Sequence, residues 1–195
     1  MLKLENITLR YGKSTVIDNL SHEFAEGKVT AIVGDSGVGK TTLLNIAAGL
    51  LRQSAGQVVR DGEKISYIFQ DPRLFPWMTA LENVSEVSDT ETAKKMLSLM
   101  GLDDSLDKYP AELSGGMKQR VSIARALAYD PDVIFLDEPF RGLDAERRQS
   151  VGDTVFALLR GKTAIMVTHD ERDLIYADVV LRLSAAPESK LKQIQ

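Results

Sequence analysis

One stretch decides how this chain folds, namely Gly34-Asp35-Ser36-Gly37-Val38-Gly39-Lys40-Thr41. Its glycines allow backbone N–H groups to turn toward the oxygens of a phosphate without a Cβ in the way. The apolar segment Val29–Val33 before it predicts a buried strand, and Thr42–Leu51 after it predicts a helix whose N-terminus adds unpaired donors. In this context Lys40 can reach the β- and γ-phosphates of a nucleotide, and the Thr41 hydroxyl can ligate Mg²⁺. Taken alone, the loop could also be a structural turn without a ligand.

A second motif ends a predicted central strand in two carboxylates. The apolar run Val133–Leu136 is followed by Asp137 and Glu138. Because α/β folds bind ligands at the carboxyl ends of parallel strands, both side chains are expected beside the phosphate loop. Asp137 would hold Mg²⁺ through a water molecule, and Glu138 would take a proton from the attacking water or orient it. Without the phosphate loop, the same residues would be an ordinary strand exit.

A third motif opens a predicted helix with a serine and two glycines. Ser114-Gly115-Gly116 precedes the helical run Lys118–Ala128. Serine is a good helix cap, and the glycines permit close approach of the backbone to a phosphate. A capped helix without any ligand is the alternative for these three residues alone.

Together and in this order, the motifs resemble those of an ABC-type ATPase subunit, the nucleotide-binding domain of an ABC transporter. The resemblance covers essentially the whole chain. Gly34–Thr41 matches the Walker A loop of that family, Leu113–Met117 its LSGGQ signature, and Val133–Asp137 its Walker B strand. The strings Phe69–Trp77 and Leu113–Arg120 resemble importers of sulfonates, nitrate and related small solutes.

The resemblance implies a role for each site residue. Glu138 stands at the position of the catalytic glutamate, Gln70 at that of the glutamine that senses Mg²⁺ and water, and His169 at that of the switch histidine on the γ-phosphate. The Mg²⁺ ligands implied are Thr41, Gln70 and Asp137. The residues implied to contact ATP are Tyr11, which would stack on adenine, and Gly34, Asp35, Ser36, Gly37, Val38, Gly39, Lys40, Thr41 and Thr42. Two subunits would face each other head to tail, so the ATP of one subunit would also meet Ser114, Gly115, Gly116 and Asp144 of the other.

The fold class follows from strands that alternate with helices, which favours a parallel α/β core. The resemblance makes this a P-loop NTPase with a RecA-like core, an N-terminal antiparallel β-subdomain and a helical subdomain inserted at about residues 77–128, all within one domain of residues 1–195. The predicted strands are Leu2–Arg10, Asn19–Phe24, Val29–Val33, Ile65–Phe69, Val133–Leu136, Thr163–Val167 and Val179–Leu183. The predicted helices are Thr42–Leu51, Thr79–Val84, Glu91–Met100, Lys118–Ala128 and Ala145–Arg160. The polar tail Ser184–Gln195 is predicted to fray.

The chain departs from the family pattern at several places. Met117 replaces the usual glutamine of the signature, and Arg141 stands where a small residue is common. The segment from Gly56 to Gln70 is compressed relative to typical relatives. The chain ends soon after Leu183, so we expect no C-terminal regulatory domain.

Composition excludes several other classes. The net charge is -4, which argues against a nucleic-acid partner. There is no cysteine, so disulfides and thiolate metal sites are impossible. No apolar run approaches the roughly 18 residues that span a bilayer, and the alternating N-terminus Met1–Glu5 does not resemble a signal peptide. Any link to a membrane must therefore come from a partner protein.

The sequence thus predicts an ATP-binding and ATP-hydrolysing subunit that energises an ABC transporter, an importer of a small nitrate-, sulfonate- or taurine-like solute. Its expected partners are a permease, a second copy of itself and, indirectly, an extracytoplasmic solute-binding protein. It would lie peripherally on the cytoplasmic face of the cell membrane. One alternative is a non-transport ABC ATPase acting on DNA or the ribosome, which the short segment between Gln70 and Ser114 and the single domain disfavour. Another is a regulator without hydrolysis, which the joint presence of Gln70, Glu138 and His169 disfavours.

Overall fold

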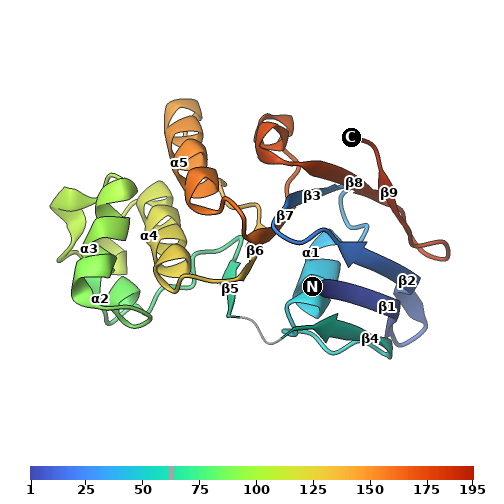
Figure 1. Ribbon diagram of the computed structural model, residues 1–195. Coiled ribbons are helices and arrows are strands. Elements are labelled where there is room, and N and C mark those ends of the chain that lie inside the picture. Colours follow the sequence, from blue (N-terminus) through green and yellow to red (C-terminus); the bar gives the residue numbers. More distant parts are fainter. Residues whose placement is uncertain (62–63) are drawn as a thin grey trace.

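The central element is a six-stranded sheet with the strand order β5-β6-β7-β3-β8-β9 (Figure 1). The computed structural model describes residues 1–61 and 64–195. Strands β5, β6, β7, β3 and β8 run parallel in this sheet, and β9 pairs antiparallel with β8. The bounds are β3 Val29–Val33, β5 Ile65–Ile68, β6 Val133–Asp137, β7 Thr163–Val167, β8 Val179–Leu183 and β9 Leu191–Gln193. Because parallel strands end at the same edge, the loops after β3, β5, β6 and β7 gather there.

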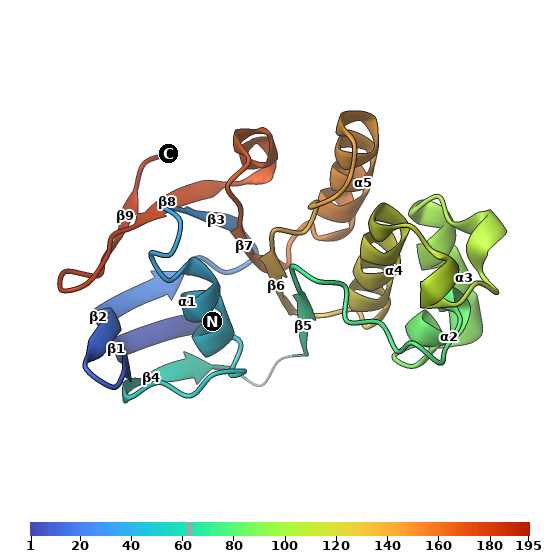
Figure 2. The same cartoon turned by 180° about the vertical axis from the view of Figure 1, so that it is seen from behind.

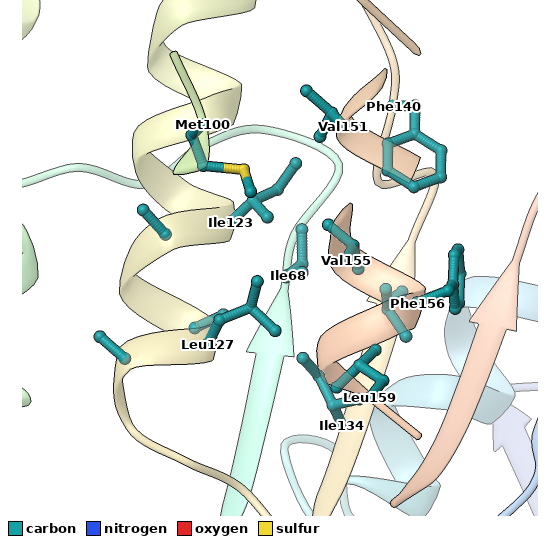
Figure 3. Close-up of a cluster of buried hydrophobic side chains, with 14 of the residues drawn as sticks. Ile68, Met100, Ile123, Leu127, Ile134, Phe140, Val151, Val155, Phe156 and Leu159 are labelled. Carbon is teal, nitrogen blue, oxygen red and sulfur yellow. The ribbon is translucent and has the colours of Figure 1, made fainter. Parts of the chain in front are cut away.

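Side chains of this sheet alternate between two hydrophobic cores, because successive residues of a strand point to opposite faces. In β6, Ile134 and Leu136 join the core under α4 (Gly115–Ala128) and α5 (Ala145–Leu158). Val133 and Phe135 join the core that contains α1 (Lys40–Ala47). Figure 3 shows the first core, where Ile123 and Leu127 of α4 face Val151 and Val155 of α5 above β5 and β6. Burial on both faces explains the nearly continuous apolar runs of these strands.

The chain begins with a three-stranded antiparallel sheet of order β2-β1-β4, with β1 Leu2–Tyr11, β2 Ser14–Phe24 and β4 Ala55–Arg60. Its buried residues, among them Leu4, Ile7 and Leu20, pack with Leu43 and Leu44 of α1 in the second core. This small sheet therefore covers α1 and fixes the helix that follows the phosphate loop.

A group of helices lies at the opposite end of the molecule, beyond β5 (Figure 2). It contains α2 (Ala80–Ser85), α3 (Thr90–Leu99) and α4, with 3₁₀ turns at Asp103–Ser105 and Pro110–Glu112. A further 3₁₀ segment, Glu171–Tyr176, follows β7. Within the described ranges, no helix is both long enough and apolar enough to cross a bilayer.

The predicted α/β class, with a parallel core and an N-terminal antiparallel sheet, is confirmed, but several element bounds differ. The second strand begins at Ser14 rather than Asn19, because it pairs with β1 up to the tight turn at Gly12. The first helix ends at Ala47, since Gly49 adopts a positive φ of 78° that terminates it. Strand β4 has no counterpart in the predicted strands. The prediction that the tail Ser184–Gln195 frays is wrong for Leu191–Gln193, which forms β9. The predicted compression between Gly56 and Gln70 includes residues 62–63, which lie outside the described residues.

Candidate active site

The phosphate loop follows β3 and ends where α1 begins. Gly37 and Gly39 have φ values of 77° and 106°, which side chains with a Cβ rarely adopt, and Gly39 is the N-cap of α1. Lys40 folds back over the loop, and its Nζ donates to the carbonyl oxygens of Gly34 at 2.8 Å and Asp35 at 2.9 Å. The loop thus surrounds an ammonium group, and the helix that follows contributes N–H donors from its first turn. This arrangement suits a bound anion, and a phosphate in particular.

Beside the loop, the hydroxyl of Thr41 donates to Oδ1 of Asp137 at 3.0 Å. Asp137 ends β6 and is only 3% exposed. Burial raises the pKa of Asp137, while the Thr41 hydrogen bond acts in the opposite direction. A carboxylate in this position is stabilised by a cation, and carboxylate and hydroxyl oxygens are ligands that Mg²⁺ accepts. The residues present therefore fit the predicted Mg²⁺ site.

The predicted catalytic residues meet at the carboxylate of Glu138. His169 Nδ1 lies 2.8 Å from Glu138 Oε1, and Gln70 Nε2 donates to Glu138 Oε2 at 3.5 Å. Gln70 follows β5, Glu138 follows β6 and His169 follows β7, and these three strands are neighbours in the sheet. Glu138 has a positive φ of 47°, and its N–H donates to the Val167 carbonyl at 2.8 Å, so its backbone is turned and held by β7.

A buried network of charges supports the segment that carries His169. Arg148 of α5 contacts Asp173 Oδ1 at 2.7 Å and Asp170 Oδ2 at 3.0 Å, and it donates to the Phe140 carbonyl at 3.2 Å. The hydroxyl of Thr168 donates to Asp173 Oδ2 at 2.6 Å. Hydrogen bonds with Arg172 are the main reason that the pKa of Asp170 lies well below its usual range, and Arg148 adds to this effect. Both neighbours of His169 in the chain are therefore anchored to α5.

The residues predicted to act on the ATP of a second subunit lie outside this cluster. Ser114 caps α4, where its Oγ accepts from the Met117 N–H at 3.2 Å, and Asp144 caps α5 by accepting from the Arg147 N–H at 2.9 Å. Gly116 packs against the loop before Asp144, because a Cβ there would lie 3.1 Å from the Gly142 carbonyl oxygen. Figure 1 shows α4 and α1 well separated in the molecule. One chain thus presents two separate halves of the predicted ATP contacts.

Three other predicted positions have defined surroundings. Tyr11 is exposed at the tip of the β1–β2 hairpin, and Val16 of the same hairpin packs 3.1 Å from where a Cβ of Gly39 would lie. Met117 packs partly buried against the helical core, so the departure from glutamine is accommodated by apolar contact. Arg141 is exposed, and its N–H donates to the Glu138 carbonyl at 3.1 Å.

Three side chains near the cluster, one buried and two partly buried, do not stand out in the sequence. Burial and the neighbouring carboxylate of Asp137 raise the pKa of Tyr67, which stacks on Phe69 with a centroid distance of 4.2 Å. Arg148 holds the His169 segment, and Gln119 of α4 donates to backbone carbonyls beside two catalytic residues. For Gln119 and Arg148, the signal that the sequence offers is a polar residue on an apolar helical face. That signal by itself does not identify a partner.

Comparison with known families identifies the family of the chain. The family model described as ABC transporter matches residues 17–141. The chain belongs to this family. It is 37% identical to the bicarbonate transport ATP-binding protein CmpD of Synechocystis sp., over 99% of this chain and 77% of that protein. It is 35% identical to the aliphatic sulfonates import ATP-binding protein SsuB of Bacillus cereus, over 99% of this chain and 84% of that protein.

Solved structures agree with this membership. The dimeric post-hydrolysis state of the ATP-binding cassette MJ0796, bound to ADP and Pi, matches with a TM-score of 0.89 and 29% identity, covering 100% of this chain and 99% of that chain. The predicted family and P-loop NTPase fold are therefore confirmed. The chain is an ATP-binding ABC transporter subunit and an ATPase.

Proposed function

We propose that this subunit powers the import of a small solute by hydrolysing ATP between two copies of itself bound to a permease. The observation that carries the proposal is the convergence of the Lys40 loop, the Thr41–Asp137 pair and the Glu138 cluster at one edge of the sheet. Phosphoryl transfer needs these three elements, namely a positive cradle, oxygen ligands for a metal ion and a group that accepts a proton from water.

Each residue of the cluster has one task in this mechanism. Lys40 exchanges the loop carbonyls for the β- and γ-phosphates of ATP. Thr41, Asp137 and Gln70 would hold Mg²⁺, which neutralises charge that develops on the phosphates. Glu138 accepts a proton from the attacking water, and His169 orients the Glu138 carboxylate through its Nδ1 contact and reaches the γ-phosphate.

The remaining predicted contacts come from the second copy. The segment Ser114–Gly116 and Asp144 of one copy would close over the ATP held by the other copy. In that other copy, Tyr11 and the phosphate loop would contact the same nucleotide. The dimeric state of the MJ0796 cassette supports this assembly. In this arrangement neither copy has a complete site alone, so hydrolysis requires the dimer.

The solute class is proposed from the relatives. Their names specify bicarbonate and aliphatic sulfonates, which are small anions handled by transporters with a separate ATP-binding subunit. A nitrate-, sulfonate- or taurine-like solute fits this group. Selection of the solute belongs to the permease and an extracytoplasmic binding protein, and this subunit would lie on the cytoplasmic face of the membrane through the permease.

A surface around Phe75 and Trp77 is the proposed contact with the permease. Trp77 is 69% exposed and Phe75 is 38% exposed, with ring centroids 5.7 Å apart. Buried Asn83 accepts from the Phe75 N–H at 2.8 Å and donates to the Met78 carbonyl at 3.0 Å, so it fixes the loop from below. A loop that anchored the helices only by its aromatic rings would bury them. Rigidly held, exposed aromatic rings suit a short helix that docks from a partner.

Replacement Phe75→Glu is expected to prevent assembly with the permease while ATP binding by the free subunit remains unchanged, because a carboxylate would have to be buried at the contact. Co-purification of the permease with a tagged subunit measures assembly. Leu50→Glu is the matched control, since Leu50 is an exposed apolar residue that follows the end of α1, away from the helical group. Normal assembly and transport with Phe75→Glu would exclude this contact.

Replacement Lys40→Ala is expected to weaken ATP binding by about 10- to 150-fold, because each hydrogen bond to a charged group contributes about 1.5–3 kcal/mol. Calorimetric titration with ATP and Mg²⁺ measures the change. Lys95→Ala, which removes an exposed lysine of α3, should bind like the wild type. Equal affinities for the two variants would remove Lys40 from the ATP site.

A further inference from the structure

Gln119 lies buried between the loops that carry two of the catalytic residues, Gln70 and Glu138. It is 2% exposed on α4, and its Nε2 donates to the Pro139 carbonyl at 2.9 Å and to the Phe69 carbonyl at 3.5 Å. A side-chain amide nitrogen has two hydrogens, so these two acceptors use its donor capacity fully. A single side chain of α4 therefore joins the loop after β5 to the loop after β6.

Each acceptor is next in the chain to a residue of the catalytic cluster. Phe69 precedes Gln70 and Pro139 follows Glu138, and the side chains of Gln70 and Glu138 are themselves 3.5 Å apart. The backbone at Glu138 is in a sparsely populated conformation, with φ at 47°, and such a conformation persists only where its surroundings hold it. The Val167 carbonyl holds the N–H of Glu138, and Gln119 holds the carbonyl of the next residue.

The helix that carries Gln119 begins at the segment Ser114–Gly116. Gln119 is five positions after Ser114, which is about 7.5 Å along a helix. Within this distance α4 is continuous and packs on α5 and the sheet, so it moves as a rigid element. Any shift of its first turn on contact with a nucleotide reaches the Gln119 amide.

We propose that Gln119 is a positioning residue that couples the catalytic pair Gln70–Glu138 of one ATP site to the signature segment serving the other site. When Ser114–Gly116 closes over the partner's ATP, Gln119 sets the carbonyls of Phe69 and Pro139 and thereby the two catalytic side chains of its own subunit. The inference rests on the proposed two-copy arrangement, and it adds a physical link between the two sites.

The test is Gln119→Leu, which keeps the approximate volume and removes both donors. We expect ATP affinity to stay within about 3-fold, since no phosphate contact is lost, and kcat to fall about 10- to 100-fold, as misplacement of catalytic groups by an ångström does. The wild-type dimer has two ATP sites, so the Hill coefficient of its ATP dependence should lie between 1 and 2. In the variant we expect this coefficient to fall to 1. Gln119→Met, with a flexible chain of similar length, replaces the leucine variant if that does not fold.

The control is Ser122→Val, at a buried polar position on the same helix. It perturbs packing but keeps both hydrogen bonds of Gln119, so its melting temperature should fall while kcat and the Hill coefficient remain those of the wild type. A Gln119 variant that keeps the wild-type kcat and Hill coefficient, or a control that loses both equally, would overturn the coupling role while leaving the proposed function intact. A wild-type Hill coefficient of 1 in the dimer would overturn the two-site arrangement and the inference with it.

Discussion

Replacement Glu138→Gln is expected to lower the rate of ATP hydrolysis by about 10²- to 10⁴-fold while ATP binding is retained, because general-base catalysis contributes that much. The amide keeps the shape of the side chain. Its oxygen can still contact His169 Nδ1, which lies 2.8 Å from Glu138 Oε1 in the wild type. It cannot take a proton from water. The change also removes a negative charge near the γ-phosphate, so an ATP-bound dimer should accumulate.

Phosphate release measures the rate, and size-exclusion chromatography with ATP and Mg²⁺ measures the dimer. Glu86→Gln supplies the control, since Glu86 is an exposed carboxylate at the end of α2 and lies in the helical group. The control should hydrolyse ATP at the wild-type rate and show no additional dimer. If Glu138→Gln hydrolyses ATP normally and stays monomeric, Glu138 is not the general base.

The parts of the fold that the sequence predicts are those determined by local patterns. The phosphate loop has its glycines and lysine at fixed spacing, and the apolar runs of β3, β6 and β7 reflect burial on both faces of the sheet. Strands β4 and β9 escape prediction because β4 is exposed over its first half and β9 is mostly exposed and only three residues long. Strand β4 forms by pairing with β1, which is distant in sequence, and β9 forms by pairing with β8, to which a loop joins it.

Local capping also moves a predicted boundary. The predicted helical run begins at Lys118, with Ser114 as a cap and two glycines ahead of it. In the structure α4 begins at Gly115, because the Ser114 side chain accepts a hydrogen bond from the Met117 N–H and stabilises the first turn. The serine that signals the motif is therefore also the reason that its glycines are helical.

The candidate site divides in the same way. Glu138 is predicted from its motif, Gln70 and His169 from the family resemblance, and the strand order then determines that they meet. Gln119 and Arg148 do not stand out in the sequence, because their partners are backbone carbonyls and carboxylates that only the folded chain brings near. The ATP contacts assigned to Ser114–Gly116 and Asp144 remain predictions that need the second copy of the chain.

The buried charges under His169 lead to the largest expected effect on stability. Arg148→Met should lower the free energy of unfolding by about 3–5 kcal/mol, as removal of one partner of a buried ion pair does. The Asp173 side chain is 2% exposed and Arg148 is 13% exposed, so the carboxylate left behind has little access to water. Its remaining hydrogen bond from the Thr168 hydroxyl does not replace a positive charge.

Chemical denaturation at neutral pH measures this loss, and Arg172→Met is the matched control. Arg172 also pairs with Asp170, but its side chain is 64% exposed, so its removal should cost less than about 1 kcal/mol. The double variant Arg148→Met with Asp173→Leu should recover most of the stability, because an apolar pair can replace a buried ion pair. Equal losses for Arg148→Met and Arg172→Met would show that burial of the pair has no special role.

The dependence on pH gives an independent check. Pairing, chiefly with Arg172 and to a smaller extent with Arg148, lowers the pKa of Asp170, so the folded state gains stability from this carboxylate above the usual aspartate range, about pH 4, and loses it as the pH falls through the lowered value. Protonation of Asp170 also removes the negative charge that Arg148 contacts. The stability difference between the wild type and Arg148→Met should therefore be largest near pH 7 and shrink in acid. A difference that is constant from pH 7 to strong acid would mean that Arg148 stabilises the segment by packing alone.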